Sequence, residues 1–305
     1  MLHHFTRSIA HIALPDKFTY PFHYTPHPLC VMAADEVQVY LQHQAQWQDE
    51  LQQGKMFGVL IVQTTEGEIG YLAAFSGILA GKNIHPYFVP PIYDLLQPDG
   101  FFKKEEEHIS AINHRIRELE EDTSYQKCRQ ALEEETARCS RLLSQAKAKL
   151  KAAKELRDCR RQTEQLSESE QAAMIRESQF QKAELKRLER SLKEHLSSLQ
   201  KETDTYVSQI EALKNERKSR SATLQQQLFE QFRLLNARGE VKDLCSIFAH
   251  TVHKIPPAGA GECAAPKLLQ YAYFHHYRPV AMAEFWWGDS PKAEIRHHGH
   301  YYPAC

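Results

Sequence analysis

Apolar residues follow one pattern at the two ends of the chain and another in its middle. In residues 1–100 and 239–305 they come in short continuous runs. The clearest runs are Met56–Val62, Ile69–Phe75 and Val280–Trp287. Such runs are typical of strands that are buried on both faces. Because turn residues at 65–68 separate the first two runs, the sequence predicts a β-hairpin there and a third strand much later.

Between Phe101 and Arg238 the apolar residues are spaced by three and four instead. The most regular series is Leu192, Leu196, Leu199, Thr203, Tyr206, Ile210 and Leu213. This spacing is typical of a coiled-coil seam. The same segment contains no glycine and no proline, although the chain has 12 glycines and 14 prolines. Since these residues are the least favourable inside helices, their absence predicts long helices throughout the segment.

The apolar seam weakens between Leu156 and Phe180, where Ser167 and Glu170 match a capping box. A capping box marks the start of a helix. We therefore expect a turn near 162–169 and an antiparallel coiled-coil hairpin. A single unbroken helix would leave its seam exposed to water unless it paired with another copy.

These patterns together predict an α+β fold. Residues 1–100 and 239–305 are expected to be the two halves of one small α/β body, and residues 101–238 to be the coiled-coil hairpin inserted between them. The other expected elements are an extended segment over 1–30, a helix over 33–53 and a helix from Pro266 to about Tyr277.

Charge adds detail mainly in the middle segment. The chain has a formal net charge of −1, but residues 101–238 carry 28 basic and 24 acidic residues. A mixed-sign surface is typical of a solvated coiled coil. One stretch near the expected turn is more basic than the rest. Its basic residues are Lys147, Lys149, Lys151, Lys154, Arg157, Arg160 and Arg161.

These basic residues are the candidate RNA-binding residues. Within the stretch they are opposed only by Glu155 and Asp158. Clusters of cations bind phosphates in a salt-dependent and sequence-independent way. An ordinary charged helix surface is the alternative interpretation.

Cysteine and histidine residues near the C-terminal end indicate a candidate metal site. Cys263 precedes an expected helix, and His300 and Cys305 follow in a histidine-rich segment. Thiolates and imidazoles are zinc ligands, so these three residues are the candidate ligands of a structural zinc. No required cofactor is expected.

The order of hairpin, cysteine-bearing helix, strand and Pro-x-Cys resembles the zinc-dependent nucleobase deaminases. In that family a glutamate stands at the start of the helix, where this chain has Ala265. The resemblance therefore implies a degenerate deaminase-like core that lacks its general acid/base. A buried cysteine with surface histidines is the alternative.

Aromatic residues gather in two places, at 271–277 and at 285–287. Both a base-stacking platform and a hydrophobic core use such residues, and we expect them to belong to the core. The seven cysteines show no disulfide-like spacing, and neither a signal peptide nor a membrane-spanning run is visible. These features predict a cytoplasmic protein with reduced thiols.

Five strings resemble the long N-terminal extension of a bacterial subgroup of RluA-type RNA pseudouridine synthases, which carry a coiled-coil insertion. The strings are GKMFGVL at 54–60, LAAFSG at 72–77, HPYFVPP at 85–91, GAGECAAPKLL at 259–269 and AEFWWG at 283–288. The resemblance spans nearly the whole chain. It implies that the catalytic domain would begin after Cys305.

The hallmark of that catalytic domain is an Arg-Leu-Asp segment followed by Thr or Ser and Gly. This chain has Arg187-Leu188-Glu189 in the expected coiled coil, with Glu in place of Asp. No catalytic residue is therefore carried over, and the chain alone is expected to be inactive.

The sequence predicts an accessory region that helps a pseudouridine synthase to bind or position structured RNA, with ribosomal RNA as the expected partner. Two alternatives stay open. One is a structural module that self-associates through its coiled coil, and the other is a zinc-binding, deaminase-like domain.

Overall fold

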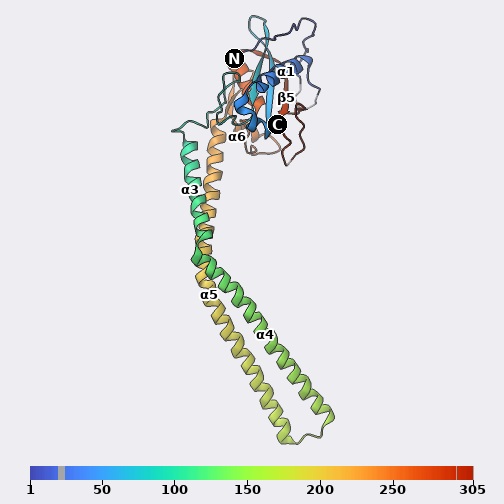
Figure 1. Cartoon of the computed structure of the whole chain (residues 1–305), viewed down its shortest axis with the longest axis vertical. Coiled ribbons are helices and arrows are strands. Elements are labelled where there is room, and N and C mark those ends of the chain that lie inside the picture. Colours follow the sequence, from blue (N-terminus) through green and yellow to red (C-terminus); the bar gives the residue numbers. More distant parts are fainter. Residues whose placement is uncertain (20–24, 293, 305) are drawn as a thin grey trace. The chain divides into compact units, whose positions relative to one another are not determined.

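The structure, a computed structural model, describes residues 1–19, 25–292 and 294–304 (Figure 1). The chain mixes helices and strands, as expected for an α+β protein. It divides into two compact units. Unit 1 contains residues 1–106 and 221–305, and unit 2 contains residues 107–220.

Unit 1 is built on a four-stranded antiparallel sheet with the strand order β2-β1-β5-β6. The strands are β1 (Lys55–Gln63), β2 (Ile69–Phe75), β5 (Arg278–Trp287) and β6 (Tyr301–Tyr302). The predicted hairpin and third strand are thus confirmed. Since β1 pairs with β5 along most of its length, the two ends of the chain form a single sheet.

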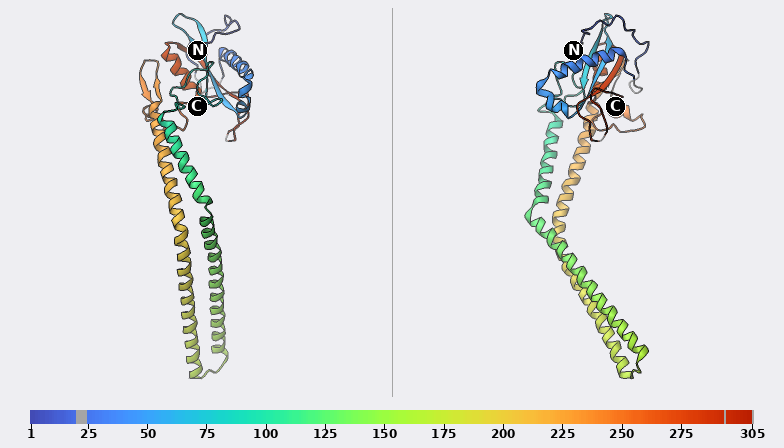
Figure 2. Two further views of the ribbon diagram at one scale, coloured as in Figure 1. Left: turned by 60° about the vertical axis from the view of Figure 1, so that its left-hand side comes forward. Right: turned by 45° about the vertical axis from the view of Figure 1, so that its right-hand side comes forward.

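Helices cover both faces of this sheet (Figure 2). The face with Phe57, Val59 and Ile61 packs on α1 (Pro28–Gln42). The opposite face, with Leu60 and Val62, packs on α7 (Ala264–Phe274). Burial on both faces explains why the strands are continuously apolar.

Gly58 allows α7 to lie close to the sheet. A Cβ atom at this position would lie 2.9 Å from the Cβ of Ala264 and 3.1 Å from Cδ1 of Leu268. Glycine inside a strand commonly marks such a close approach of another element.

The helix predicted over 33–53 is wrong in its limits. It begins at Pro28, where the His27 side chain accepts a hydrogen bond from the Leu29 amide and proline provides a preformed first turn. After Gln42 the chain leaves the helix and forms two further short helices. These are η1 (Ala45–Trp47) and α2 (Gln48–Gln52). The extended segment expected over 1–30, of which residues 20–24 lie outside the described residues, therefore overlaps the start of α1.

The helical segment expected to reach Arg238 ends earlier. Helix α5 (Glu168–Gln231) stops where Phe232, which is 1 % exposed, enters an apolar cluster with Phe229 and Leu244. The chain then forms the hairpin β3 (Arg233–Leu235) and β4 (Val241–Asp243) and the short helix α6 (Leu244–Phe248). Burial of an aromatic side chain outweighs helix propensity at this point.

Unit 2 is formed by α3 (Phe101–Glu121), α4 (Thr123–Thr163) and α5, of which α3 begins and α5 ends in unit 1. Within unit 2, α3 and α4 lie beside α5 (Figures 1 and 2). The hydrogen bonds and ion pairs that join α5 to α3 and α4 are Asn113–Arg217, Glu120–Lys214, Lys147–Glu189 and Arg157–Gln181. Because the residue number falls along α5 as it rises along α3 and α4, the helices are antiparallel.

The loop between α4 and α5 ends in the capping box. The amide and hydroxyl of Ser167 donate to the Glu170 carboxylate at 2.9 and 2.7 Å, and the Glu170 amide points back to the Ser167 hydroxyl at 3.4 Å. These reciprocal bonds satisfy amides that a helix start leaves unpaired.

Candidate functional site

The basic residues selected from the sequence all lie on α4, and most of them are paired with carboxylates. The ion pairs are Lys147–Glu189 at 3.3 Å, Lys151–Glu155 at 3.9 Å, Arg160–Glu164 at 2.9 Å and Arg161–Asp158 at 3.2 Å. Exposed pairs of this kind are weak and can exchange their partner for another anion.

Arg157 differs from its neighbours because its side chain is buried. Only 6 % of the residue is exposed, and Nη1 donates to Oε1 of Gln181 at 2.8 Å. Oε1 of Glu177 lies 3.8 Å from the same nitrogen. Arg157 therefore ties α4 to α5, and we no longer expect it to contact a phosphate.

Lys149 and Lys154 are the most available cations of the set. Both are exposed, and neither makes an ion pair with another described residue. Because no carboxylate of a described residue neutralises these two side chains, they would attract an anionic partner most strongly.

The candidate metal ligands are not brought together in the described residues. Cys263 is the residue before α7, and its thiol lies 3.9 Å from the carbonyl oxygen of Gly259. His300 lies next to β6, where its ring packs against His297. Cys305 lies outside the described residues. No group of three His, Cys, Asp or Glu residues in the described ranges is placed to hold a metal.

A glutamate does lie at the start of α7, but it comes from the sheet. The Glu284 carboxylate on β5 accepts a hydrogen bond from the Ala265 amide at 2.9 Å. Burial raises the pKa of Glu284 to about 7, although this amide and the charge of Arg296 act in the opposite direction. Sequence reasoning missed this residue because it lies far from Ala265 along the chain.

Lys267 on α7 is the second buried charged side chain here. Its ammonium group donates to the carbonyl oxygens of Phe75 at 2.9 Å and Gly77 at 3.4 Å. Burial lowers the pKa of Lys267 to about 8. Since Glu284 is 1 % exposed and Lys267 3 % exposed, both groups bind α7 to the sheet rather than face a substrate.

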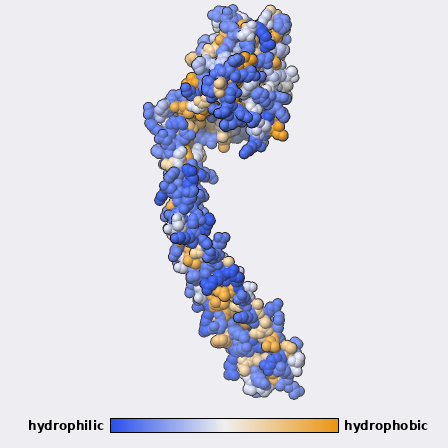
Figure 3. All heavy atoms as spheres, in the orientation of Figure 1, coloured by the Kyte–Doolittle hydropathy of each residue, from blue (hydrophilic) through white to orange (hydrophobic). Residues whose placement is uncertain are grey.

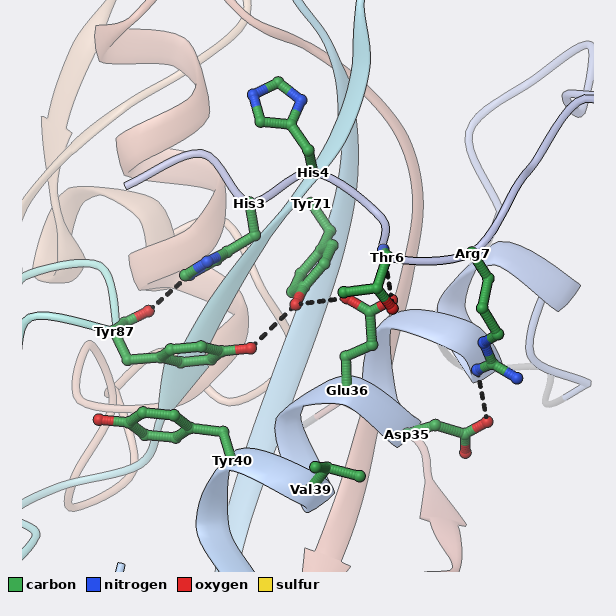
Figure 4. A pocket seen from close by; sticks show the side chains of 10 residues that line it. All are labelled: His3, His4, Thr6, Arg7, Asp35, Glu36, Val39, Tyr40, Tyr71 and Tyr87. Carbon is green, nitrogen blue, oxygen red and sulfur yellow. Dashed lines mark hydrogen bonds and ion pairs between the residues drawn. The ribbon is translucent and has the colours of Figure 1, made fainter. Parts of the chain in front are cut away.

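The N-terminal segment borders a hollow of about 610 Å³ beside α1 (Figure 4). The Glu36 carboxylate accepts hydrogen bonds from the amide and hydroxyl of Thr6, at 2.9 and 2.7 Å, and from the Tyr71 hydroxyl at 3.0 Å. The Tyr71 and Tyr87 hydroxyls are 2.9 Å apart. Because Tyr71 donates to Glu36, Tyr87 donates to Tyr71.

Aromatic rings complete this hollow. The Tyr87 ring lies between His3, at a centroid distance of 4.2 Å, and Tyr40, at 3.8 Å. Burial lowers the pKa of His3 and raises the pKa of Tyr71 and Tyr87, so all three are neutral at neutral pH. His3 also exchanges two backbone hydrogen bonds with Tyr71. We therefore interpret the network as an anchor for the N-terminal segment.

The aromatic residues of the sequence analysis divide into two groups. Phe285, Trp286 and Trp287 on β5 are buried, as expected for a core. Phe274 at the end of α7 is 69 % exposed and does not belong to the core. Helix α7 presents Ala264, Leu268 and Ala272 to the sheet. Tyr271 and Tyr277 are partly buried against the same cluster, so within this group it is Phe274 that departs from the expectation.

These features define an α+β protein. No protein-family model matches the chain, and neither the curated proteins nor the solved structures give a match. No helix within the described ranges has both the length and the apolar character needed to cross a membrane.

Proposed function

We propose that this chain is the accessory N-terminal region of an RluA-type RNA pseudouridine synthase. In this proposal it binds structured RNA, with ribosomal RNA the expected partner, for a catalytic domain that follows it. One observation carries the proposal: the strings that resemble the family all lie in unit 1, around the two faces of one sheet. They form β1, the end of β2, the start of α7, the end of β5 and the loop 85–91.

Direct contacts join these strings to one another. The Gly77 amide donates to the carbonyl oxygen of Glu262 at 3.0 Å, and the Val89 amide donates to that of Ala73 at 2.9 Å. Lys267 and Glu284 add the bonds described above. The five strings therefore belong to one unit, as the resemblance to a single N-terminal extension implies.

Within the same proposal, unit 2 is an antiparallel coiled coil that carries part of the RNA-binding surface. Support comes from the apolar cluster of Ile116, Leu119 and Ile210 and from the exposed lysines of α4. The proposal also includes a deaminase-like origin of unit 1, since the hairpin, α7 and β5 follow in the order of that family. Because Ala265 stands where that family has its catalytic glutamate, we propose binding and not deamination.

Fluorescence anisotropy with a labelled ribosomal RNA fragment at increasing salt tests the proposal. We expect salt-dependent binding that weakens about tenfold in Lys149→Glu/Lys154→Glu, since two phosphate contacts become repulsive. Lys193→Glu/Lys201→Glu on α5 makes the same change in net charge at exposed positions and is the matched control. Absence of RNA binding, or binding that ignores salt, would contradict the proposal.

Self-association is a second candidate function, because apolar side chains are exposed on unit 2. Leu156 is 64 % exposed, Ile175 51 % and Phe180 62 %. Phe180 also borders a hollow of about 370 Å³ between α4 and α5, and apolar groups lie among the polar ones toward the α4–α5 loop (Figure 3). Sedimentation velocity on the same samples separates the two functions: a dimer without RNA affinity would favour this second candidate.

A further inference from the structure

The outward aromatic end of α7 lies beside the β3–β4 hairpin in unit 1. The hairpin is fixed to α7 by a hydrogen bond of 2.7 Å from the Leu235 amide to Oε1 of Gln270. Its turn is held by the Asn236 side chain, which accepts bonds from the amides of Arg238 and Glu240 at 2.9 and 3.0 Å. The hairpin therefore has a defined conformation and a fixed position beside α7.

The end of α7 is equally well defined. His276 has φ +59° and follows the last helical turn, and the Tyr277 amide donates to the carbonyl oxygen of Ala272 at 2.8 Å. This arrangement is a Schellman-type helix end. It places Tyr277 and Arg278 on the side of the helix that borders the hairpin, where they line the same hollow as Phe274.

Two adjoining hollows separate the hairpin from α7, and we call them together the α7 groove. Their volumes are about 730 and 470 Å³. Tyr273 and residues 235–237 line both of them, so the two hollows adjoin. A groove of this size accommodates more than one planar ring.

The lining of the α7 groove combines aromatic rings with positive charge. Tyr273, Phe274 and Tyr277 provide the rings. Arg278 is held by Oε1 of Gln63, a neutral partner, at 2.7 and 3.1 Å, and Arg238 makes no ion pair with a described residue. Among the described residues that line the groove there is no aspartate or glutamate.

We propose that the α7 groove binds a single-stranded segment of RNA. Its bases would stack on Tyr273, Phe274 and Tyr277, and its phosphates would face Arg238 and Arg278. Aromatic platforms beside cations are the usual means of holding unpaired nucleotides, because every base has a π-face and every linkage a negative charge. Paired RNA hides its bases from such a platform. The inference rests on the proposed function for the nature of the partner, and adds a site in unit 1 that is distinct from the lysines of unit 2.

The test measures the affinity of the full chain for a labelled single-stranded oligouridylate and for a duplex of similar length. Phe274→Ala should weaken binding of the single strand about tenfold, since one stacking contact is lost. Phe274→Tyr should retain the affinity. Ile295→Ala, which removes a comparably exposed apolar side chain outside the groove, is the control and should leave it unchanged.

A second variant and a spectroscopic signal separate stacking from charge. Arg238→Gln/Arg278→Gln should also weaken binding about tenfold and make it less dependent on salt. An oligonucleotide with 2-aminopurine should lose fluorescence on stacking in the wild type and in Phe274→Tyr, and lose less of it in Phe274→Ala. Circular dichroism of each variant verifies that unit 1 is folded.

Three results would overturn the inference. RNA binding that is weakened by changes at Lys149 and Lys154 but not by the groove variants would exclude the α7 groove as an RNA site and leave the proposed function intact. Absence of any RNA affinity would exclude both the groove site and the proposed function. Binding of an acidic peptide in place of the oligonucleotide, lost in Phe274→Ala, would assign the groove to a protein partner.

Discussion

At the scale of single residues, Glu284 shows how a long-range contact sets local chemistry. Its position in an apolar strand gives no sign of an unusual carboxyl group. In the folded protein it lies under α7, where it accepts a hydrogen bond from the Ala265 amide and is removed from water. Desolvation disfavours the ionised form and raises the pKa of Glu284 to about 7.

Glu284→Gln should change the dependence of stability on pH. The unfolded carboxyl ionises near its ordinary pKa of 4.5 and the folded one near 7, so the unfolded state loses its proton first. The wild type should therefore lose about 3 kcal/mol of unfolding free energy as the pH rises through this window. The variant should not show this loss, because the introduced side-chain amide is neutral and its oxygen can still accept from the Ala265 amide.

Urea unfolding followed by tryptophan fluorescence measures this effect, since all three tryptophans lie in unit 1. Glu66→Gln, at an exposed turn position, is the control and should follow the wild type. Parallel pH profiles of Glu284→Gln and the wild type would show that Glu284 ionises normally.

At the scale of elements, the break between α3 and α4 depends on one cap. Asp122 lies between two helices, and its carboxylate accepts hydrogen bonds from the amides of Ser124 at 2.7 Å and Tyr125 at 3.0 Å. Sequence reasoning treated this stretch as unbroken helix because it has neither glycine nor proline. The short side chain of aspartate competes with the helix for backbone amides, which is why a break forms without them.

Asp122→Ala should destabilise unit 2 by about 1 kcal/mol, since two amides at the start of α4 lose their acceptor. Asp122→Asn keeps an oxygen at the same place and should retain most of the stability. Thermal melting followed by circular dichroism measures the difference, and faster hydrogen exchange at the Ser124 amide locates it. Melting of Asp122→Ala at the wild-type temperature would show that the cap contributes nothing.

At the scale of the whole molecule, the two ends of the chain depend on each other. Strand β1 belongs to the first segment of unit 1 and its partner β5 to the second. A core divided in this way can fold only after the ends meet, whatever lies between them. The five strings of the family resemblance are likewise divided between the two segments.

Unit 1 should therefore fold without unit 2. We expect a variant in which a short Gly/Ser linker replaces residues 107–220 to unfold cooperatively, with the tryptophan emission of the full chain. Such a linker is geometrically reasonable, because the side chains of Asn113 and Arg217, near the two ends of unit 2, are joined by a hydrogen bond of 3.1 Å. Residues 1–106 alone are the control and should not fold, because β1 would lack β5. A linked variant without a cooperative transition would contradict the separation into two units.

The sequence by itself determined those features that depend on neighbouring residues. Continuous apolar runs specified β1, β2 and β5, because only strands covered on both faces need them. The absence of glycine and proline specified long helices, and Ser167 with Glu170 specified where α5 begins. Backbone sterics and hydrogen bonds within a few residues decide these features.

The tertiary structure alone decided which distant residues meet. It buried Arg157 against Gln181, although that arginine resembles its exposed neighbours in sequence. It also ended α5 at Gln231, just before the buried Phe232, and brought the β3–β4 hairpin against α7, which created the α7 groove. Burial and pairing depend on surfaces that come together only in the folded chain, and a pattern read along the chain does not contain them.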